Sequence, residues 1–107
     1  MIAGFIVRDA PARLVLRALG PSLSRQGLGS ALSDPSLQLF SGQTLLAESD
    51  DWADGATAGE LKESGLAPGD AREPGLVVTL QPGAYTAIVR GAGDRAGIAL
   101  VEVFQTR

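Results

Sequence analysis

The chain has 107 residues, a length that corresponds to one domain able to bury a hydrophobic core without disulfide bonds. Its net charge is −3 and its lysines and arginines form no cluster, so binding to nucleic acid or to an anionic membrane surface is disfavoured. The absence of cysteine and histidine excludes a disulfide framework, thiolate chemistry and a Ser-His-Asp triad.

Seven short segments have the alternating or continuously apolar composition of β-strands. They are Ile2–Val7, Arg13–Ala18, Pro35–Phe40, Thr44–Glu48, Leu76–Leu80, Ala84–Val89 and Ile98–Phe104. Because glycine- and proline-rich turns separate them, we predict an antiparallel, Greek-key-like β-sandwich of about seven or eight strands. Residues 1–107 form its single domain, and a short helix or helical turn, weakened by Gly59, is predicted over 56–64.

The apolar opening segment, Ile2–Val7, bears on where the protein acts. It is too short to span a membrane as a helix, and it lacks the basic region and cleavage site of a secretory signal. We therefore expect no membrane insertion, and we expect any export signal to have been removed or to lie in a longer parent protein.

Alternation is clearest over residues 13–18. The even positions Leu14, Leu16 and Ala18 share one face, and the odd positions Arg13, Val15 and Arg17 share the other. This pattern predicts a half-exposed strand. The two arginines could bind an anionic ligand, but such side chains more often pair with acids on a neighbouring strand.

A tight turn at Pro82 and Gly83 leads directly into Tyr85 near the start of a predicted strand. In Greek-key sandwiches a tyrosine in this position packs on the core while its hydroxyl group binds a nearby backbone group. We predict such a tyrosine corner, which is a structural feature rather than a catalytic one.

Three aspartates, Asp50, Asp51 and Asp54, surround the single tryptophan, Trp52. The spacing does not match an EF-hand loop, but the carboxylates could supply oxygens to a looser calcium site. The alternative is a polar turn in which Asp54 or Thr57 caps the following helix and Trp52 packs back on the core. Calcium is the only cofactor that this stretch indicates.

Other motifs with a chemical appearance fail on spacing. The segment Gly20–Ser24 resembles a nucleophile elbow but lacks its final glycine, and no histidine is present to activate Ser22. Adjacent aspartates on an extended chain point to opposite faces, which disfavours a catalytic carboxylate pair. The loop Gly91–Gly97 has the wrong spacing for a phosphate-binding loop, and it lies between two predicted strands with no helix after it to bind an anion. We therefore predict no catalytic residues and no enzymatic activity.

Six segments together resemble a β-sandwich repeat of very long secreted proteins from environmental bacteria, which is itself similar to bacterial pre-peptidase C-terminal domains. They are Ile2–Val7, Val15–Leu23, Leu32–Pro35, Ser49–Trp52, Leu80–Thr86 and Ala99–Val103, and the resemblance extends over nearly the whole chain. The resemblance implies a non-catalytic module outside the cell or on its surface. It also implies that an acidic loop can bind calcium, as in some pre-peptidase-type domains.

The chain departs from this family at its start, where members usually carry a further polar segment before the strand that matches Ile2–Val7. A sandwich short of one strand exposes an edge that a strand of the next copy can complete, and head-to-tail completion gives filaments. We therefore expect self-association, or contact with neighbouring repeats of the same protein. The residues expected near the contact are Ile2, Phe5, Val7, Ile98, Leu100 and Phe104. The alternative is a monomeric accessory module of a larger secreted protein that binds calcium through the aspartates, or carbohydrate by stacking on Trp52.

Overall fold

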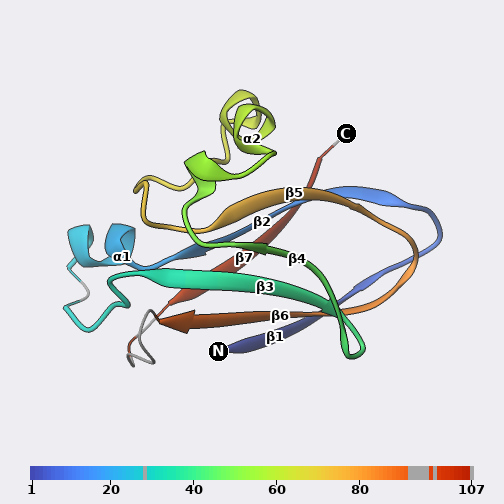
Figure 1. Cartoon of the computed structure of the whole chain (residues 1–107), viewed down its shortest axis with the longest axis horizontal. Helices are drawn as coiled ribbons and strands as arrows, with labels where there is room; N and C mark the ends of the chain where they lie inside the picture. Colours follow the sequence, from blue (N-terminus) through green and yellow to red (C-terminus); the bar gives the residue numbers. More distant parts are fainter. Residues whose placement is uncertain (28, 92–96, 98, 107) are drawn as a thin grey trace.

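The computed structural model describes residues 1–27, 29–91, 97 and 99–106. Within these residues it contains two antiparallel sheets that pack face to face (Figure 1), so the predicted all-β sandwich is confirmed. The four-stranded sheet has the order β1 (Ile2–Val7), β6 (Gly83–Gly91), β3 (Pro35–Ser41) and β4 (Thr44–Ser49). The three-stranded sheet has the order β5 (Gly75–Leu80), β2 (Ala12–Leu19) and β7 (Leu100–Thr106). Residues 92–96 of the predicted Gly91–Gly97 loop, and the predicted contact residue Ile98, lie outside the described residues.

Three short helical elements join the strands: α1 (Pro21–Arg25), the 3-10 turn η1 (Trp52–Asp54) and α2 (Ala58–Ser64). The helix predicted over 56–64 is therefore confirmed as α2, but its predicted capping is wrong. Thr57 holds the N-cap position and no side chain caps the helix. The Thr57 hydroxyl oxygen instead accepts a hydrogen bond from the backbone N–H of Val77 on β5, at 3.1 Å.

The main core lies between the two sheets and includes Leu14, Leu16 and Ala18 of β2, as the alternation predicts. A smaller cluster of Val15, Leu61 and Val77 lies on the outer face of the three-stranded sheet, beneath α2. The prediction of a half-exposed strand is therefore wrong for β2, because α2 covers the face that carries Val15. Val15 is completely buried.

The two arginines of β2 lie on this same outer face, and both pair with acids. Arg13 forms a bidentate ion pair with Glu60 of α2, and Arg17 pairs with Glu102 of β7 at 2.9 Å. The Arg17 guanidinium also lies 5.0 Å from the ring centroid of Phe104. The prediction that these arginines pair with acids on neighbouring elements is thus confirmed.

The predicted tyrosine corner is confirmed. The Tyr85 hydroxyl donates a hydrogen bond to the carbonyl oxygen of Gln81 at 2.6 Å, across the turn that contains Pro82 and Gly83. The ring of Tyr85 stacks on that of Phe5 with centroids 5.7 Å apart. The turn between β5 and β6 is thereby fixed to the first strand, β1.

One charged side chain, Glu73, lies fully buried before β5. Its carboxylate accepts hydrogen bonds from the backbone N–H groups of Gly20, Ser22 and Asp70, and from the Ser22 hydroxyl group. Its backbone carbonyl accepts the N–H of Trp52 at 3.0 Å. Because α1 and its preceding turn have no other side-chain cap, this carboxylate takes the place of one. Glu73 therefore joins the start of α1, the loop before β5 and η1.

The neighbouring Asp70 holds the outer part of this loop. The guanidinium groups of Arg72 and Arg25 both bind its carboxylate, at 3.0 and 2.7 Å. These hydrogen bonds hold the pKa of Asp70 well below its usual range, and the bond from Arg72 has the largest effect. Asp70 therefore stays ionised, and its contribution to stability is lost only as the pH falls below the usual range for aspartate.

Candidate functional site

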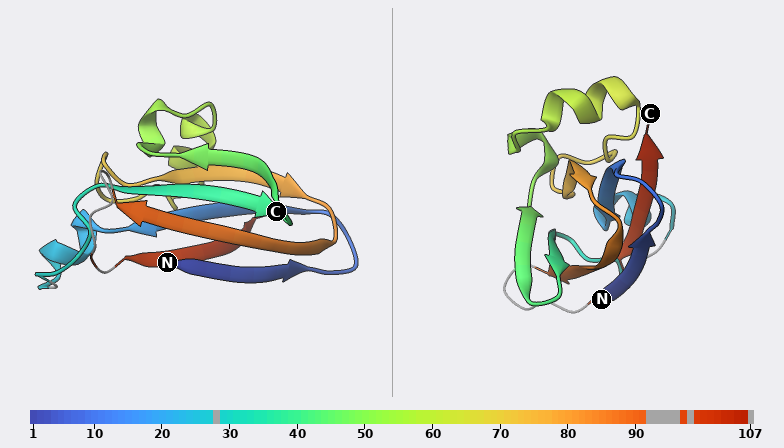
Figure 2. Two further views of the ribbon diagram at one scale, coloured as in Figure 1. Left: turned by 60° about the horizontal axis from the view of Figure 1, so that its bottom comes forward. Right: turned by 90° about the vertical axis from the view of Figure 1, so that its right-hand side faces the viewer.

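The strands β1 and β7 form one side of the sandwich. Each is the edge strand of its sheet, and the two lie side by side without pairing to each other (Figure 2). A groove with a volume of about 410 Å³ runs between them. It is lined by the apolar side chains of Phe5 and Val7 from β1, Leu14 from β2 and Val103 from β7, and also by the polar Arg8 and Gln105. This side of the sandwich is therefore open.

The free edge of β1 can be assigned residue by residue. Met1 and Val89 exchange two backbone hydrogen bonds, of 3.0 and 2.8 Å, which makes them a hydrogen-bonded pair of the β1–β6 ladder. Because such pairs alternate in an antiparallel ladder, the backbone groups of Ile2, Gly4 and Ile6 point away from β6. These three residues form the free edge of β1.

Apolar side chains accompany this free edge. Ile2 is 72% exposed and Ile6 is 62% exposed, while Leu100 and Val103 of β7 are also exposed. The strand β1 carries no charged side chain. Natural sheets usually protect an edge with charges, proline or a bulge, because an uncovered edge can accept another strand. The edge of β1 has no such protection.

On the opposite side of the sandwich, where β4 and β5 are the edge strands, side chains satisfy part of the β5 edge. The hydroxyl oxygens of Ser49 and Thr57 accept the N–H groups of Gly75 and Val77, which lie on the outer edge of β5. The helix α2 and the turn η1 pack beside this edge. The two edges therefore differ. Side-chain hydroxyl groups accept hydrogen bonds from N–H groups of β5, whereas the outward backbone groups of β1 are left free.

The predicted contact residues divide between the surface and the interior. Ile2 and Leu100 are exposed, whereas Val7 is buried and Phe5 and Phe104 are partly buried. The sequence analysis did not single out Ile6 and Val103, which are exposed on the same two strands. The period of two along β1 could have found Ile6, because it places Ile6 on the same face as Ile2.

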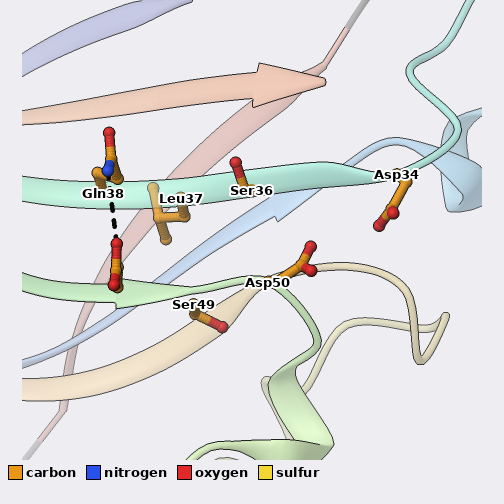
Figure 3. A pocket seen from close by; sticks show the side chains of 7 residues that line it. Asp34, Ser36, Leu37, Gln38, Ser49 and Asp50 are labelled. Atoms are coloured by element: carbon orange, nitrogen blue, oxygen red, sulfur yellow. Dashed lines mark hydrogen bonds between the residues drawn. The ribbon is translucent and has the colours of Figure 1, made fainter. Parts of the chain in front are cut away.

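A second candidate site lies where β3 begins and β4 ends. The carboxylates of Asp34, Asp50 and Asp51 approach within 4.8 Å of one another. Asp34 and Asp50 point toward each other across a cleft of about 410 Å³, which Ser36 and Gln38 also line (Figure 3). The structure thus brings the predicted Asp50 and Asp51 together and adds Asp34.

Asp54 lies outside this group of three carboxylates. The sequence analysis missed Asp34, which lies far from the others in the chain but immediately precedes β3. The signal that could have found Asp34 is the antiparallel pairing of β3 with β4, in which Leu37 lies opposite Ser49. Continued by one residue, that register places Asp50 opposite Ser36, and Asp34 lies two residues before Ser36 on the same face of the strand.

The carboxylates of Asp34, Asp50 and Asp51, called the acidic group below, repel one another. Partial burial raises the pKa of Asp50 above its usual range, and the neighbouring charges of Asp34 and Asp51 raise it further. One oxygen of Asp34, Oδ1, is buried and has no hydrogen-bond partner. Oxygen ligands gathered in this way are of the type that calcium prefers, and a bound cation would remove their repulsion.

Trp52 lies beside this cleft but faces the interior. Its side chain packs against the small cluster of Val15, Leu61 and Val77. Its indole Nε1 is buried and makes no hydrogen bond. This placement agrees with the interpretation of the segment as a turn whose tryptophan packs on the core, and it leaves less of the ring free for a sugar.

Comparison of the chain with protein-family models, with curated proteins and with solved structures finds no match. The resemblance to secreted β-sandwich repeats therefore stays a prediction. None of the helices in the described part of the chain is long and apolar enough to cross a membrane.

Proposed function

We propose that this protein is a non-catalytic structural module that acts outside the cell by associating with copies of itself or with neighbouring repeats. The contrast between its two sides carries the proposal. The β5 edge is satisfied by Ser49 and Thr57, whereas the β1 edge offers free backbone groups beside exposed apolar side chains. The extracellular setting rests on the resemblance to repeats of secreted proteins.

Addition of a strand to β1 supplies both affinity and specificity. The backbone of the incoming strand satisfies the free N–H and C=O groups, and its side chains bury the apolar surface along β1 and β7. A contact of this kind, when it joins different surfaces head to tail, does not close and so extends into a filament. A contact that joins identical surfaces closes into a dimer.

The test is the particle mass of the purified chain, measured by light scattering over a dilution series. We expect the mass to rise above 11.0 kDa with concentration. Replacing Ile6 by lysine places a charge on the free edge and should weaken association at least tenfold, by about 1.4 kcal/mol or more. Gln43→Lys adds the same charge in the exposed β3–β4 turn and should leave association unchanged.

A mass that stays at 11.0 kDa at every concentration would exclude self-association of this chain. Equal weakening by Ile6→Lys and Gln43→Lys would show that net charge, rather than the edge of β1, controls the contact.

A second candidate function is that of a calcium-binding accessory module, which the approach of Asp34, Asp50 and Asp51 favours. We expect calcium to raise the melting temperature of the natural chain relative to chelator, because it binds the folded acidic group. The Asp50→Asn variant should lose this rise. Asp54→Asn should retain it, because Asp54 lies outside the group.

In chelator the same Asp50→Asn change should have the opposite effect and stabilise the fold slightly at pH 7, since it removes like-charge repulsion that solvent partly screens at this exposed position. The raised pKa of Asp50 fixes the sign. The repulsion is fully present above that pKa, and it is relieved as the pH falls through it. Melting curves that are identical in calcium and chelator would exclude the calcium function.

A further inference from the structure

The free edge of β1 has the same pattern when read from either end. Ile2 and Ile6 stand two residues on either side of Gly4, and all three residues lie on the exposed face of the strand. Their backbone groups are also those that point away from β6. A strand with this arrangement is complementary to a second copy of itself in the antiparallel direction.

We propose that the occupant of this edge is β1 of a second copy, paired about a twofold axis that passes through Gly4. In this register Gly4 lies opposite Gly4 of the second copy, and each Ile2 lies opposite an Ile6. All of these are hydrogen-bonded pairs, each of which exchanges two backbone hydrogen bonds. The two four-stranded sheets then become one continuous sheet. This inference rests on the proposed self-association and specifies its partner.

Side-chain chemistry supports the same register. The cross-strand pairs of Ile2 with Ile6 place two β-branched side chains against each other on one face, which stabilises antiparallel pairing. No charge on β1 opposes the approach, although each chain carries a net charge of −3. Gly4 adds no side chain at the axis, so the two backbones can meet there without a steric conflict.

The twofold axis also acts on the open groove. Because β7 lies beside β1 on the same side of the sandwich (Figure 2), extension of the sheet past β1 covers the mouth of the groove. Val103 of β7, which lines that groove, is then shielded together with Ile2 and Ile6. The contact therefore covers part of the exposed apolar surface of both edge strands, through Ile2, Ile6 and Val103. A filament built from such dimers requires a second contact elsewhere on the module.

Cysteine substitution tests the register, because the natural chain contains no cysteine. In the Gly4→Cys variant the two thiols of a dimer lie directly opposite each other, with Cα atoms about 5.5 Å apart, a separation within the range of disulfides. The only described atom within 4 Å of a Cβ at position 4 is the Tyr85 carbonyl oxygen, at 3.8 Å, so the substitution fits the fold. We expect oxidation, or a short bifunctional thiol reagent, to convert Gly4→Cys into covalent dimers.

Matched variants distinguish this register from others. Ile2→Cys alone and Ile6→Cys alone should form no disulfide, because equivalent residues are then about four positions, or roughly 14 Å, apart along the strands. An equimolar mixture of the two variants should link, since Ile2 lies opposite Ile6. The natural chain should reach a limiting mass of twice 11.0 kDa through this contact.

The outcomes separate the inference from the proposed function. Growth of mass with concentration but no link in Gly4→Cys would overturn the twofold pairing and leave self-association standing. Covalent linkage of Ile2→Cys with itself would establish a different register and would also overturn the pairing. A mass fixed at that of one chain would overturn both.

Discussion

Replacing Glu73 by alanine is expected to lower the free energy of unfolding by roughly 3 kcal/mol or more, because a buried, hydrogen-bonded carboxylate is removed. The carboxylate is fully buried and accepts hydrogen bonds from Gly20, Ser22 and Asp70. Removing it takes the acceptor from all of these donors, of which the Gly20 N–H lies in a buried hydrogen bond. Fluorescence of the single tryptophan, Trp52, can follow the denaturation, since its ring packs against the small cluster beneath α2 in the folded chain.

Two milder variants show whether the loss comes from the carboxylate. Glu73→Gln keeps the shape but turns one acceptor into a donor, so about half of the destabilisation should remain. Ser22→Ala removes a single hydrogen bond to the carboxylate and should cost about 1 kcal/mol. If Glu73→Ala cost no more than Ser22→Ala, the carboxylate would not be the centre of this network.

Gly20→Ala is expected to destabilise the fold by about 2–4 kcal/mol through overpacking. A Cβ at this position would overlap the backbone carbonyl oxygen of Leu32 and lie 3.2 Å from the Cδ atom of Pro35. Neither group is the flexible end of a side chain, so the backbone itself must move. Movement here also pulls the Gly20 N–H away from the Glu73 carboxylate, which adds to the cost.

The matched control is Gly59→Ala within α2. Nothing lies within 4 Å of a Cβ placed there, and alanine is the better helix former, so this variant should stabilise by about 0.5–1 kcal/mol. The same chemical change should therefore give opposite signs at the two positions when unfolding is followed by urea titration. A loss of stability in both variants would mean that added volume is not what distinguishes Gly20.

The strands could be predicted from the sequence because their signals are local. Alternation in β2 placed Leu14, Leu16 and Ala18 in the core, and the turn before Tyr85 predicted its hydroxyl bond to the backbone. Glycine and proline at the turns bounded each strand to within a few residues. In these segments local pattern and tertiary packing agree, which is why the sandwich was recognisable.

Features that depend on long-range contacts could not be predicted in this way. Val15 is buried only because Leu61 of α2, far along the chain, covers it. Glu73 reads as an ordinary polar loop residue until the fold brings Gly20 and Ser22 to it. Asp34 joins the acidic group only through the register of β3 with β4. In each case the missing information was a pairing rather than a residue preference.

The pairing of the first strands with the last ones sets the order in which this domain can fold. β1 pairs with β6 and β2 pairs with β7, and the bond from Met1 to Val89 joins residues 88 positions apart. Such distant pairings close large loops, so chain entropy is lost before the strand hydrogen bonds form. Domains with pairings of this kind fold on a timescale of milliseconds to seconds. During synthesis on the ribosome, the uncharged strand β1 emerges before β6 and remains unpaired until β6 is made. During that interval its free edges could pair with a strand of another unfinished copy, and chaperones or a low local concentration of such copies would prevent this.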